Sequence, residues 1–262
     1  MVQKRLGSLS PLLSDTPESL YWMGFLLADG YFTENRLKVT LGVKDEDHLR
    51  KLGNFLGGVP VKNIKSKSGF GEFNAVTLAI MHSTVMRELR TKWGITNNKT
   101  YNPPKLDWLC SDALLYFMVG FIDGDGCIKR QSGRNDAIIL IKNHATWLPI
   151  LSKLNQQLHL DQGVTSSNGY LDTKGYANIA ICKAEVIKSL KLKSYDVPSL
   201  SRKWDRIDET IKSRGARARF NAIEIKRLME MGVSKGDIAK HLRISPSCVS
   251  NTIKRKKLQI TF

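Results

Sequence analysis

A pattern of ten residues occurs twice in this chain of 262 residues, and it limits the possible folds more than any other feature. The two copies share four matched residues: Gly24, Phe25, Asp29 and Gly30 recur 96 positions later as Gly120, Phe121, Asp125 and Gly126. Segments 79–89 and 180–190 also match, at an offset of 101 positions. A repeat of about one hundred residues is too long for a solenoid and predicts two copies of one domain fused into a pseudo-dimer.

Each copy shows the same order of secondary-structure signals. An apolar helix ends in Asp-Gly, and in the strand that follows copy one, Leu37, Val39 and Leu41 alternate with polar residues. A second helix, two further strands and a last helix complete each copy. The order αββαββα predicts an α+β fold, in which two pseudo-symmetric domains each carry helices on one side of an antiparallel sheet.

The charge of the chain predicts a polyanionic partner. Lys and Arg number 41 against 24 Asp and Glu, which gives a formal net charge of +17, so nucleic acid or an anionic membrane surface is expected. Residues 201–262 alone hold 16 Lys and Arg against 6 Asp and Glu, which indicates a distinct basic module. The expected domains are residues 1–105, 106–212 and 213–262.

The sequence contains no apolar run of membrane-spanning length and no signal-peptide core near its start. Its four cysteines are scattered, without a Cys-x-x-Cys pair. We therefore expect a reduced, intracellular protein that is not secreted, in the cytoplasm or nucleoid of a bacterium or phage-infected cell, with an organelle as the alternative.

An acid ends each of the two apolar helices. Both helices carry small residues four positions apart, which allow close packing between helices. If the helices cross about a pseudo-two-fold axis, Asp29 and Asp125 emerge together at the negative ends of the helix dipoles, where a cation would relieve their repulsion. Carboxylates and carbonyls suit Mg²⁺, which can activate water and stabilise a leaving phosphate-ester oxygen.

Two other interpretations of these acids are weaker. An Asp-Gly ending can be a plain helix-closing turn, but its recurrence at matched positions argues against that reading. A calcium loop starting at Asp123 fails because its twelfth position is Arg134 rather than Glu.

Segments 22–30 and 118–126 resemble the two signature helices of LAGLIDADG homing endonucleases, in the form that carries both motifs in one chain. In pattern the likeness extends over residues 19–205. It implies paired αββαββα domains whose sheets form a saddle on the DNA major groove, and metal-dependent cutting of both strands between the two motifs. Leu27 replaces the motif's first acid in copy one, whereas copy two keeps it as Asp123; in the family this acid is usually structural.

The resemblance also implies roles for individual residues. The candidate catalytic and metal-binding residues are Asp29, Asp125, Ala28, Gly124, Lys99 and Lys203. The two acids bind the metal, the carbonyls of the two small residues are further ligands, and the lysines are accessory basic groups, with a solvated charge as the alternative for each lysine. The implied cofactor is Mg²⁺, in two or more ions, with Mn²⁺ or Ca²⁺ as substitutes in vitro.

Polar and cationic side chains on the expected strands form a candidate DNA-reading surface. Donors placed against base edges and cations placed against phosphates are what such a surface requires. Period-two alternation gives positions 36, 38 and 40 one strand face and 63, 65 and 67 another, the candidates of copy two lie near the equivalent strand, and together they form a polar, cationic surface opposite the apolar face. The candidates are Arg36, Lys38, Thr40, Asn63, Lys65, Lys67, Lys129, Gln131 and Arg134.

Three short helices are expected in the C-terminal module, over residues 222–231, 234–242 and 246–254. Ser245 suits an N-cap and Pro246 a first helical position. The pattern resembles the helix-turn-helix of bacterial regulators and resolvases, whose third helix enters the major groove. The candidate contacts are Ser247, Ser250, Asn251 and Lys254. A small basic bundle that binds protein is the alternative.

Together these features predict a sequence-specific, Mg²⁺-dependent DNA endonuclease that acts in intron homing, a monomer on a long asymmetric duplex site. The alternative is a non-cleaving DNA-binding regulator or an RNA-splicing cofactor on the same scaffold, with host intron RNA as partner. Retention of both Asp29 and Asp125 favours cleavage. A membrane-surface role is set aside because no basic amphipathic helix with an aromatic face is present.

Overall fold

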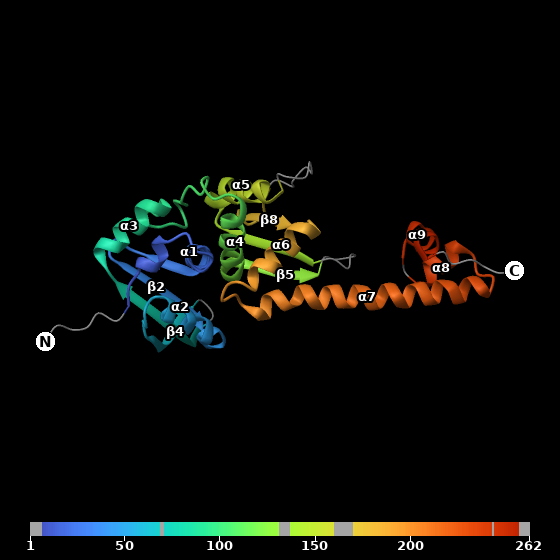
Figure 1. The fold of residues 1–262 in the computed structure, drawn as a ribbon, viewed down its shortest axis with the longest axis horizontal. Helices are drawn as coiled ribbons and strands as arrows, with labels where there is room; N and C mark the ends of the chain where they lie inside the picture. Colours follow the sequence, from blue (N-terminus) through green and yellow to red (C-terminus); the bar gives the residue numbers. More distant parts are fainter. Residues whose placement is uncertain (1–6, 69–70, 131–136, 160–169, 243, 257–262) are drawn as a thin grey trace. The chain divides into compact units, whose positions relative to one another are not determined.

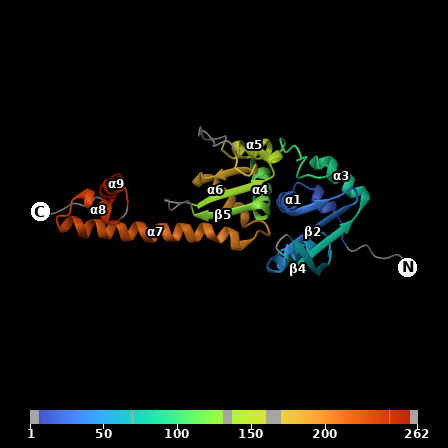
Figure 2. The same ribbon diagram turned by 180° about the vertical axis from the view of Figure 1, so that it is seen from behind.

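The computed structural model describes residues 7–68, 71–130, 137–159, 170–242 and 244–256. The chain divides into two compact units within helix α7 (Ser201–Glu230): unit 1 ends at Ile207 and unit 2 begins at Asp208. Figure 1 and Figure 2 show the elements of each unit from opposite sides. In the described part of the chain, no helix is both long and apolar enough to span a bilayer.

The first repeat of unit 1 begins after a short 3₁₀ turn, η1 (Ser10–Leu13). Its elements are α1 (Pro17–Asp29), β1 (Gly30–Phe32), β2 (Arg36–Gly42), the 3₁₀ turn η2 (Val43–Asp45), α2 (Glu46–Phe55), β3 (Val61–Ser68), β4 (Gly71–Met81) and α3 (Ser83–Trp93).

The second repeat has the same order of helices and strands. Its elements are α4 (Ser111–Asp125), β5 (Gly126–Arg130), β6 (Ala137–Asn143), the 3₁₀ turn η3 (Ala145–Trp147), α5 (Leu148–His159), β7 (Tyr170–Leu171), β8 (Ala177–Ile181) and α6 (Ala184–Ser194). The predicted αββαββα order is confirmed in both repeats.

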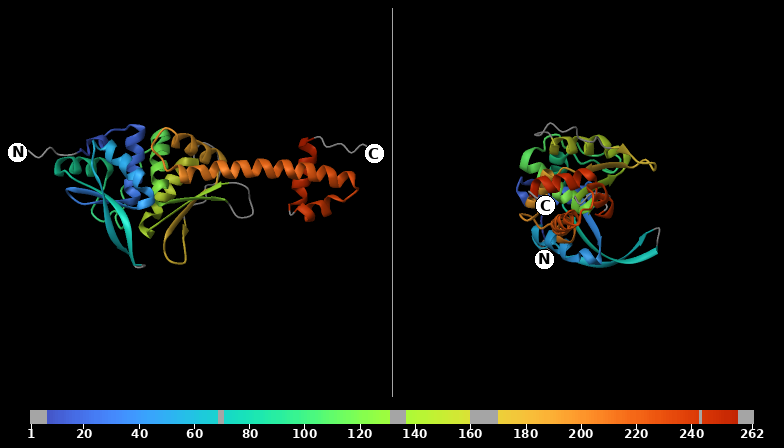
Figure 3. Two further views of the ribbon diagram at one scale, coloured as in Figure 1. Left: turned by 90° about the horizontal axis from the view of Figure 1, so that it is seen from below. Right: turned by 90° about the vertical axis from the view of Figure 1, so that its right-hand side faces the viewer.

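Each repeat forms one four-stranded antiparallel sheet. The strand orders are β1-β2-β4-β3 and β5-β6-β8-β7, so the two sheets have the same topology. In unit 1 the helices gather on one side of the strands, as the view from below in Figure 3 shows. This is the predicted α+β layout, and it leaves the other face of each sheet uncovered by helices of its own repeat.

The apolar residues of both repeats form one continuous core. Alternation along β2 buries Leu37 and Val39, and alternation along β6 buries Ile139 and Ile141. Trp22, Phe25 and Phe121, from the two apolar helices, are almost completely buried at its centre. The repeats are therefore joined by shared apolar packing and form one folded body.

Helices α1 and α4 pack backbone against backbone. A Cβ atom at Gly24 would overlap the carbonyl oxygen of Phe117, and one at Gly120 would overlap the carbonyl oxygen of Tyr21. These two contacts are related by the repeat, because positions 21 and 117 are themselves 96 apart. The close crossing that the small residues predicted is therefore present, and only glycine fits at its centre.

Unit 2 has a small apolar core of its own. Ile225 and Leu228 from α7 pack with Ile238 and Ala239 from α8 (Lys235–Leu242) and Val249 from α9 (Pro246–Lys256). The expected separate helix over 222–231 is wrong, because that segment is the end of the 30-residue helix α7. No proline interrupts the sequence 201–230, so nothing in it forces a break.

Replacing Gly120 by Ala should destabilise unit 1 by about 1–3 kcal/mol, because the added methyl group must displace the backbone of α1. Alanine is otherwise favoured over glycine inside a helix by about 1 kcal/mol, so a loss would oppose the intrinsic preference. Urea unfolding measures the change. Gly42→Ala is the control, because its φ of −65° suits alanine and the new Cβ would lie 4.0 Å from the nearest atom, Lys44 Cγ. Equal midpoints for the two variants would contradict the packing argument.

Candidate active site

Asp29 and Asp125 are the last residues of α1 and α4, and the chain enters β1 and β5 directly after them. The crossing of the two helices brings these ends together. A Cβ built at Gly124 would lie 3.4 Å from Asp29 Oδ2, so the Asp29 carboxylate reaches the last turn of the other helix. The structure therefore juxtaposes the two acids that the sequence singled out.

Both acids are harder to ionise than ordinary aspartates. Loss of hydration, and after it the charge of Asp29, raises the pKa of Asp125 to about 6, while Lys99 and Lys203 oppose the shift. Asp29 is solvent-accessible, yet surrounding protein displaces part of its hydration and this raises its pKa too, again against the two lysines. Two acids face two lysines, and both carboxylates lack part of the hydration that stabilises an ordinary aspartate.

Lys99 and Lys203 occupy equivalent places at the two helix ends. Lys99 Nζ donates to the carbonyl oxygens of Leu27 at 2.7 Å and Ala28 at 2.9 Å. Lys203 Nζ donates to the matched oxygens, of Asp123 at 2.5 Å and Gly124 at 3.3 Å. Each ammonium group thus lies at the negative end of a helix dipole. Burial lowers the pKa of both lysines, which the acids oppose.

The solvated-charge alternative for these lysines does not describe their positions, because both are partly buried and hydrogen-bonded. The Ala28 and Gly124 carbonyls, expected as metal ligands, accept lysine hydrogen bonds here. A carbonyl oxygen has two lone pairs, so this contact leaves a second position for another partner.

Asn143, at the end of β6, was missed by sequence reasoning. Its Nδ2 donates to Asp125 Oδ2 at 2.6 Å, and its Oδ1 accepts from the backbone N–H of His144 at 2.8 Å, which fixes the amide with its NH₂ group toward the acid. The matched position in the first repeat is Leu41, because Gly30 pairs with Val39 as Gly126 pairs with Ile141. Asn143 therefore orients Asp125, whereas the aliphatic side chain of Leu41 cannot orient Asp29.

Asp123 joins three helices in the core. Its Oδ2 accepts from Tyr21 Oη and from the backbone N–H of Leu200, both at 2.8 Å, and its Oδ1 accepts from Trp204 Nε1 at 2.9 Å. Burial raises its pKa to about 6 although these donors lower it. The contacts fit the structural role that the resemblance implied, and they fix the start of α7, which carries Lys203.

A divalent cation could be held by the two carboxylates. No group of three or more His, Cys, Asp or Glu side chains suited to a metal occurs among the described residues. Mg²⁺ needs no such group, because it is commonly bound by one or two carboxylates, water and substrate phosphates. Asp29 and Asp125, adjoining and poorly hydrated, fit such an ion.

The strand pairing shows on which face of the sheet each predicted DNA-reading residue lies. Arg36, Lys38 and Thr40 alternate with buried Leu37 and Val39 and so lie on the outward face of their sheet. The Thr40 and Thr77 hydroxyl oxygens, from neighbouring strands of that face, are 3.1 Å apart. In the second sheet, Lys129 is exposed next to buried Ile128 and lies outward as well.

The expected placement of Asn63 and Lys65 opposite the apolar face is wrong. Val61 pairs with buried Leu78 and Asn63 pairs with buried Val76, so this alternate set lies on the same face of the sheet as the core, although Asn63 and Lys65 are themselves exposed. Lys62, which pairs with Thr77, lies on the outward face of β3 together with Ile64 and Ser66. The Lys67 side chain, Gln131 and Arg134 lie outside the described residues.

In unit 2 the predicted contact residues lie on α9. Ser247, Asn251 and Lys254 are exposed and Ser250 is partly exposed. Ser245 Oγ accepts from the N–H of Cys248 at 3.2 Å, so the predicted N-cap is confirmed, and Pro246 is the first residue of the helix.

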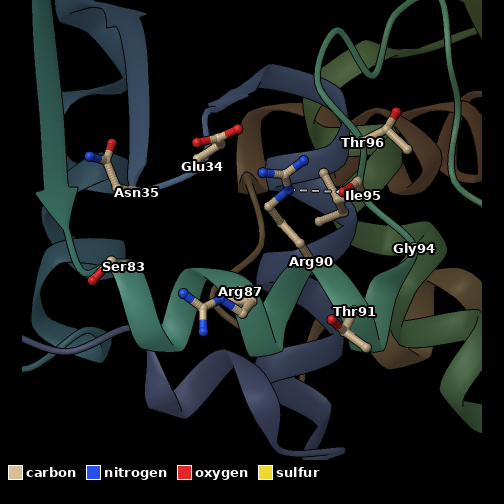
Figure 4. A pocket seen from close by; sticks show the side chains of 9 residues that line it. All are labelled: Glu34, Asn35, Ser83, Arg87, Arg90, Thr91, Gly94, Ile95 and Thr96. Carbon is tan, nitrogen blue, oxygen red and sulfur yellow. Dashed lines mark hydrogen bonds between the residues drawn. The ribbon is translucent and has the colours of Figure 1, made fainter.

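A cavity of about 640 Å³ lies away from these groups, between the β1–β2 turn and α3. Figure 4 shows Glu34 on one side of it and Arg87 and Arg90 on the other, with the Arg90 Nε hydrogen bond to the Ile95 carbonyl. Neither Asp29 nor Asp125 lines this cavity. The candidate site at the two helix ends is therefore separate from this cavity.

No protein-family profile matches the chain, and no curated protein matches it. Solved structures resemble it in chain path. The LAGLIDADG meganuclease I-AabMI bound to uncleaved DNA is 11% identical, with 79% of this chain and 92% of that chain covered and a TM-score of 0.47. The homing endonuclease I-WcaI bound to its DNA recognition sequence is 12% identical, with coverages of 74% and 87% and a TM-score of 0.49. I-SmaMI bound to an uncleaved DNA target with calcium ions is 12% identical, with coverages of 93% and 97% and a TM-score of 0.43.

Asp125→Asn should stabilise the protein, by an amount that grows with pH. The folded-state pKa of about 6 lies above the ordinary 3.8, so the carboxyl group's contribution is fully present below pH 3.8 and is lost as pH rises through 6. We expect the free energy of unfolding of the variant, taken relative to that of the wild type, to be about 1–3 kcal/mol higher at pH 8 than at pH 3.5. Urea unfolding at both pH values measures this. Asp112→Asn, at an exposed acid paired with Lys193, controls for loss of one negative charge. A pH-independent difference would disprove the shift.

Proposed function

We propose that this protein is a metal-dependent, site-specific double-strand DNA endonuclease of the LAGLIDADG homing-endonuclease type. The observation that carries the proposal is the pair of acids at two crossed helix ends, each end also held by a lysine. The outward cations of the two sheets and the formal charge of +17 support DNA as the substrate.

Asp29 and Asp125 would hold the metal, which when bound activates water and stabilises charge on a phosphate ester. Lys99 and Lys203 offset part of the charge of the acids and present donors at the helix ends. Asn143 keeps one Asp125 oxygen in a fixed position by donating to it. The helix crossing sets the spacing of the acids before substrate arrives, so little reorganisation is left for the reaction.

The experiment is digestion of a DNA library that carries the presumed insertion locus with purified protein and Mg²⁺, followed by sequencing of the ends produced. We expect one defined pair of ends. Asp29→Asn and Asp125→Asn should each slow cutting by more than about a hundredfold, since metal binding supplies several kcal/mol of transition-state stabilisation. Binding of the same duplex should survive in both variants.

Asp112→Asn is the matched control for cleavage, because this acid is exposed and pairs with Lys193 on the surface. It should cut at the wild-type rate. Tight, specific binding by the wild type without any cutting would overturn the endonuclease and leave the DNA-binding regulator. Cutting without Mg²⁺ or another divalent ion would overturn the role of the metal.

We further infer that the basic C-terminal residues, 213–262, form a separate DNA-binding domain, with residues 1–105 and 106–212 as the two repeats. The separate apolar core of unit 2 supports this division. The exposed positions Ser247, Asn251 and Lys254 on α9 support a contact with DNA through that helix.

Lys254→Ala should weaken binding about equally for all sequences and reduce the slope of log affinity against log salt by about one, as expected for a phosphate contact. Asn251→Ala should instead weaken binding to the specific site more than to random duplex. Titrations at several salt concentrations measure both. Lys235→Ala, at the first residue of α8, is the control for charge alone. Unchanged affinity and salt slope for Lys254→Ala would reject the contact.

A further inference from the structure

The outward faces of the two sheets differ at matched positions of their second strands. Gly30 pairs with Val39 in the first sheet as Gly126 pairs with Ile141 in the second, which aligns the two repeats. The alignment sets Lys38 against Leu140. It likewise sets Arg36 against Ile138, so two cations of the first repeat are replaced by two aliphatic side chains in the second.

The cross-strand neighbours extend this difference. Lys38 lies between Tyr31 on β1 and Ala79 on β4, whereas Leu140 lies between Cys127 on β5 and Ala180 on β8. Cys127 is exposed, and Leu140 and Ala180 are partly exposed. Ile138 is buried and contributes little surface. The outward face of the second sheet therefore has an apolar strip formed by Leu140, Cys127 and Ala180.

Cations flank this strip and point to the kind of surface that covers it. Lys129 on β5 and Lys142 on β6 alternate with buried Ile128 and Ile141, so they lie on the same outward face as Leu140. Lys142 is held by Asp172, at 2.7 Å, and over the Tyr176 ring. Cations around an apolar strip match the DNA major groove, where phosphates border base edges and thymine offers an apolar methyl group.

We propose that the second sheet reads its half of the target through thymine methyl groups packed on Leu140 and Cys127, whereas the first sheet reads its half through the donors Arg36 and Lys38. The proposal rests on the proposed function and specifies the chemistry of the sequence that the enzyme recognises. It requires a target whose two halves differ in composition, with thymine–adenine pairs under the second sheet.

The test uses a synthetic duplex of the cleavage site found by sequencing, with EDTA present so that no strand is cut. Uracil, which lacks the C5 methyl group, replaces thymine in one half at a time, and fluorescence anisotropy measures affinity. Each contacted methyl group should be worth about fourfold in affinity, from about 0.8 kcal/mol per buried carbon. The loss should occur only in the half under the second sheet, which a photo-crosslinker at position 129 identifies.

Two variants separate the strip from general effects. Leu140→Lys, which installs the residue of the first repeat, should abolish the thymine–uracil difference and steepen the salt dependence by about one. Cys127→Ser should reduce the difference with less risk to folding, because this side chain is exposed. Lys38→Leu is the matched control and should leave the thymine–uracil difference in place.

The outcomes distinguish this proposal from the proposed function. Absence of any specific duplex binding would reject the endonuclease itself. Specific binding with equal affinity for thymine and uracil would overturn only the reading chemistry, as would a half-site without thymine–adenine pairs under the second sheet. Retention of the full difference in Leu140→Lys would show that another surface contacts the methyl groups.

Discussion

The backbone contact between α1 and α4 at Gly24 and Gly120 determines the rest of this structure. A helix rises by about 1.5 Å per residue, so fixing two glycines against each other also fixes the residues five positions later, which are the two acids. A larger side chain at the crossing would separate Asp29 from Asp125. The distance on which the proposed chemistry depends is thus set by packing in the core, away from the solvent-exposed helix ends.

Two acids at two helix C-termini repel each other and the helix dipoles, and the chain offsets this repulsion only in part. The helix dipoles and the two carboxylates all contribute negative potential there. Lys99 and Lys203 are directed to the carbonyl oxygens of the helix ends, so they offset the dipoles more directly than they pair with the acids. The pKa of Asp125 is raised to about 6, first by loss of hydration and then by the charge of Asp29, and a cation would stabilise the ionised pair.

The repeat made the architecture and the centre of the site predictable. Residues that match at a fixed spacing indicate two copies of one domain, and matched residues at the pseudo-two-fold axis are expected to lie side by side. Lys99 and Lys203 were found as candidates, although nothing in the sequence showed that they bind matched carbonyls. Asn143 was missed because its acid lies in another element, 18 positions away. Asn63 and Lys65 were placed on the wrong face because the apolar residues of β3, Val61 and Ile64, are three positions apart and so do not alternate to define one apolar face.

Fusion of the two repeats lets matched positions diverge where each half has different neighbours. Asp123 receives donors from the start of α7, whereas its counterpart Leu27 is fully buried in the apolar core. Asn143 orients Asp125, whereas Leu41 packs against the core. Lys38 and Leu140 extend the same divergence to the outward faces. A symmetric homodimer could not hold any of these pairs, since one sequence would serve both halves. The glycines, acids and lysines at the crossing are the same in both repeats. In the proposed reaction both strands of one duplex are cut there, so each half needs the same catalytic groups.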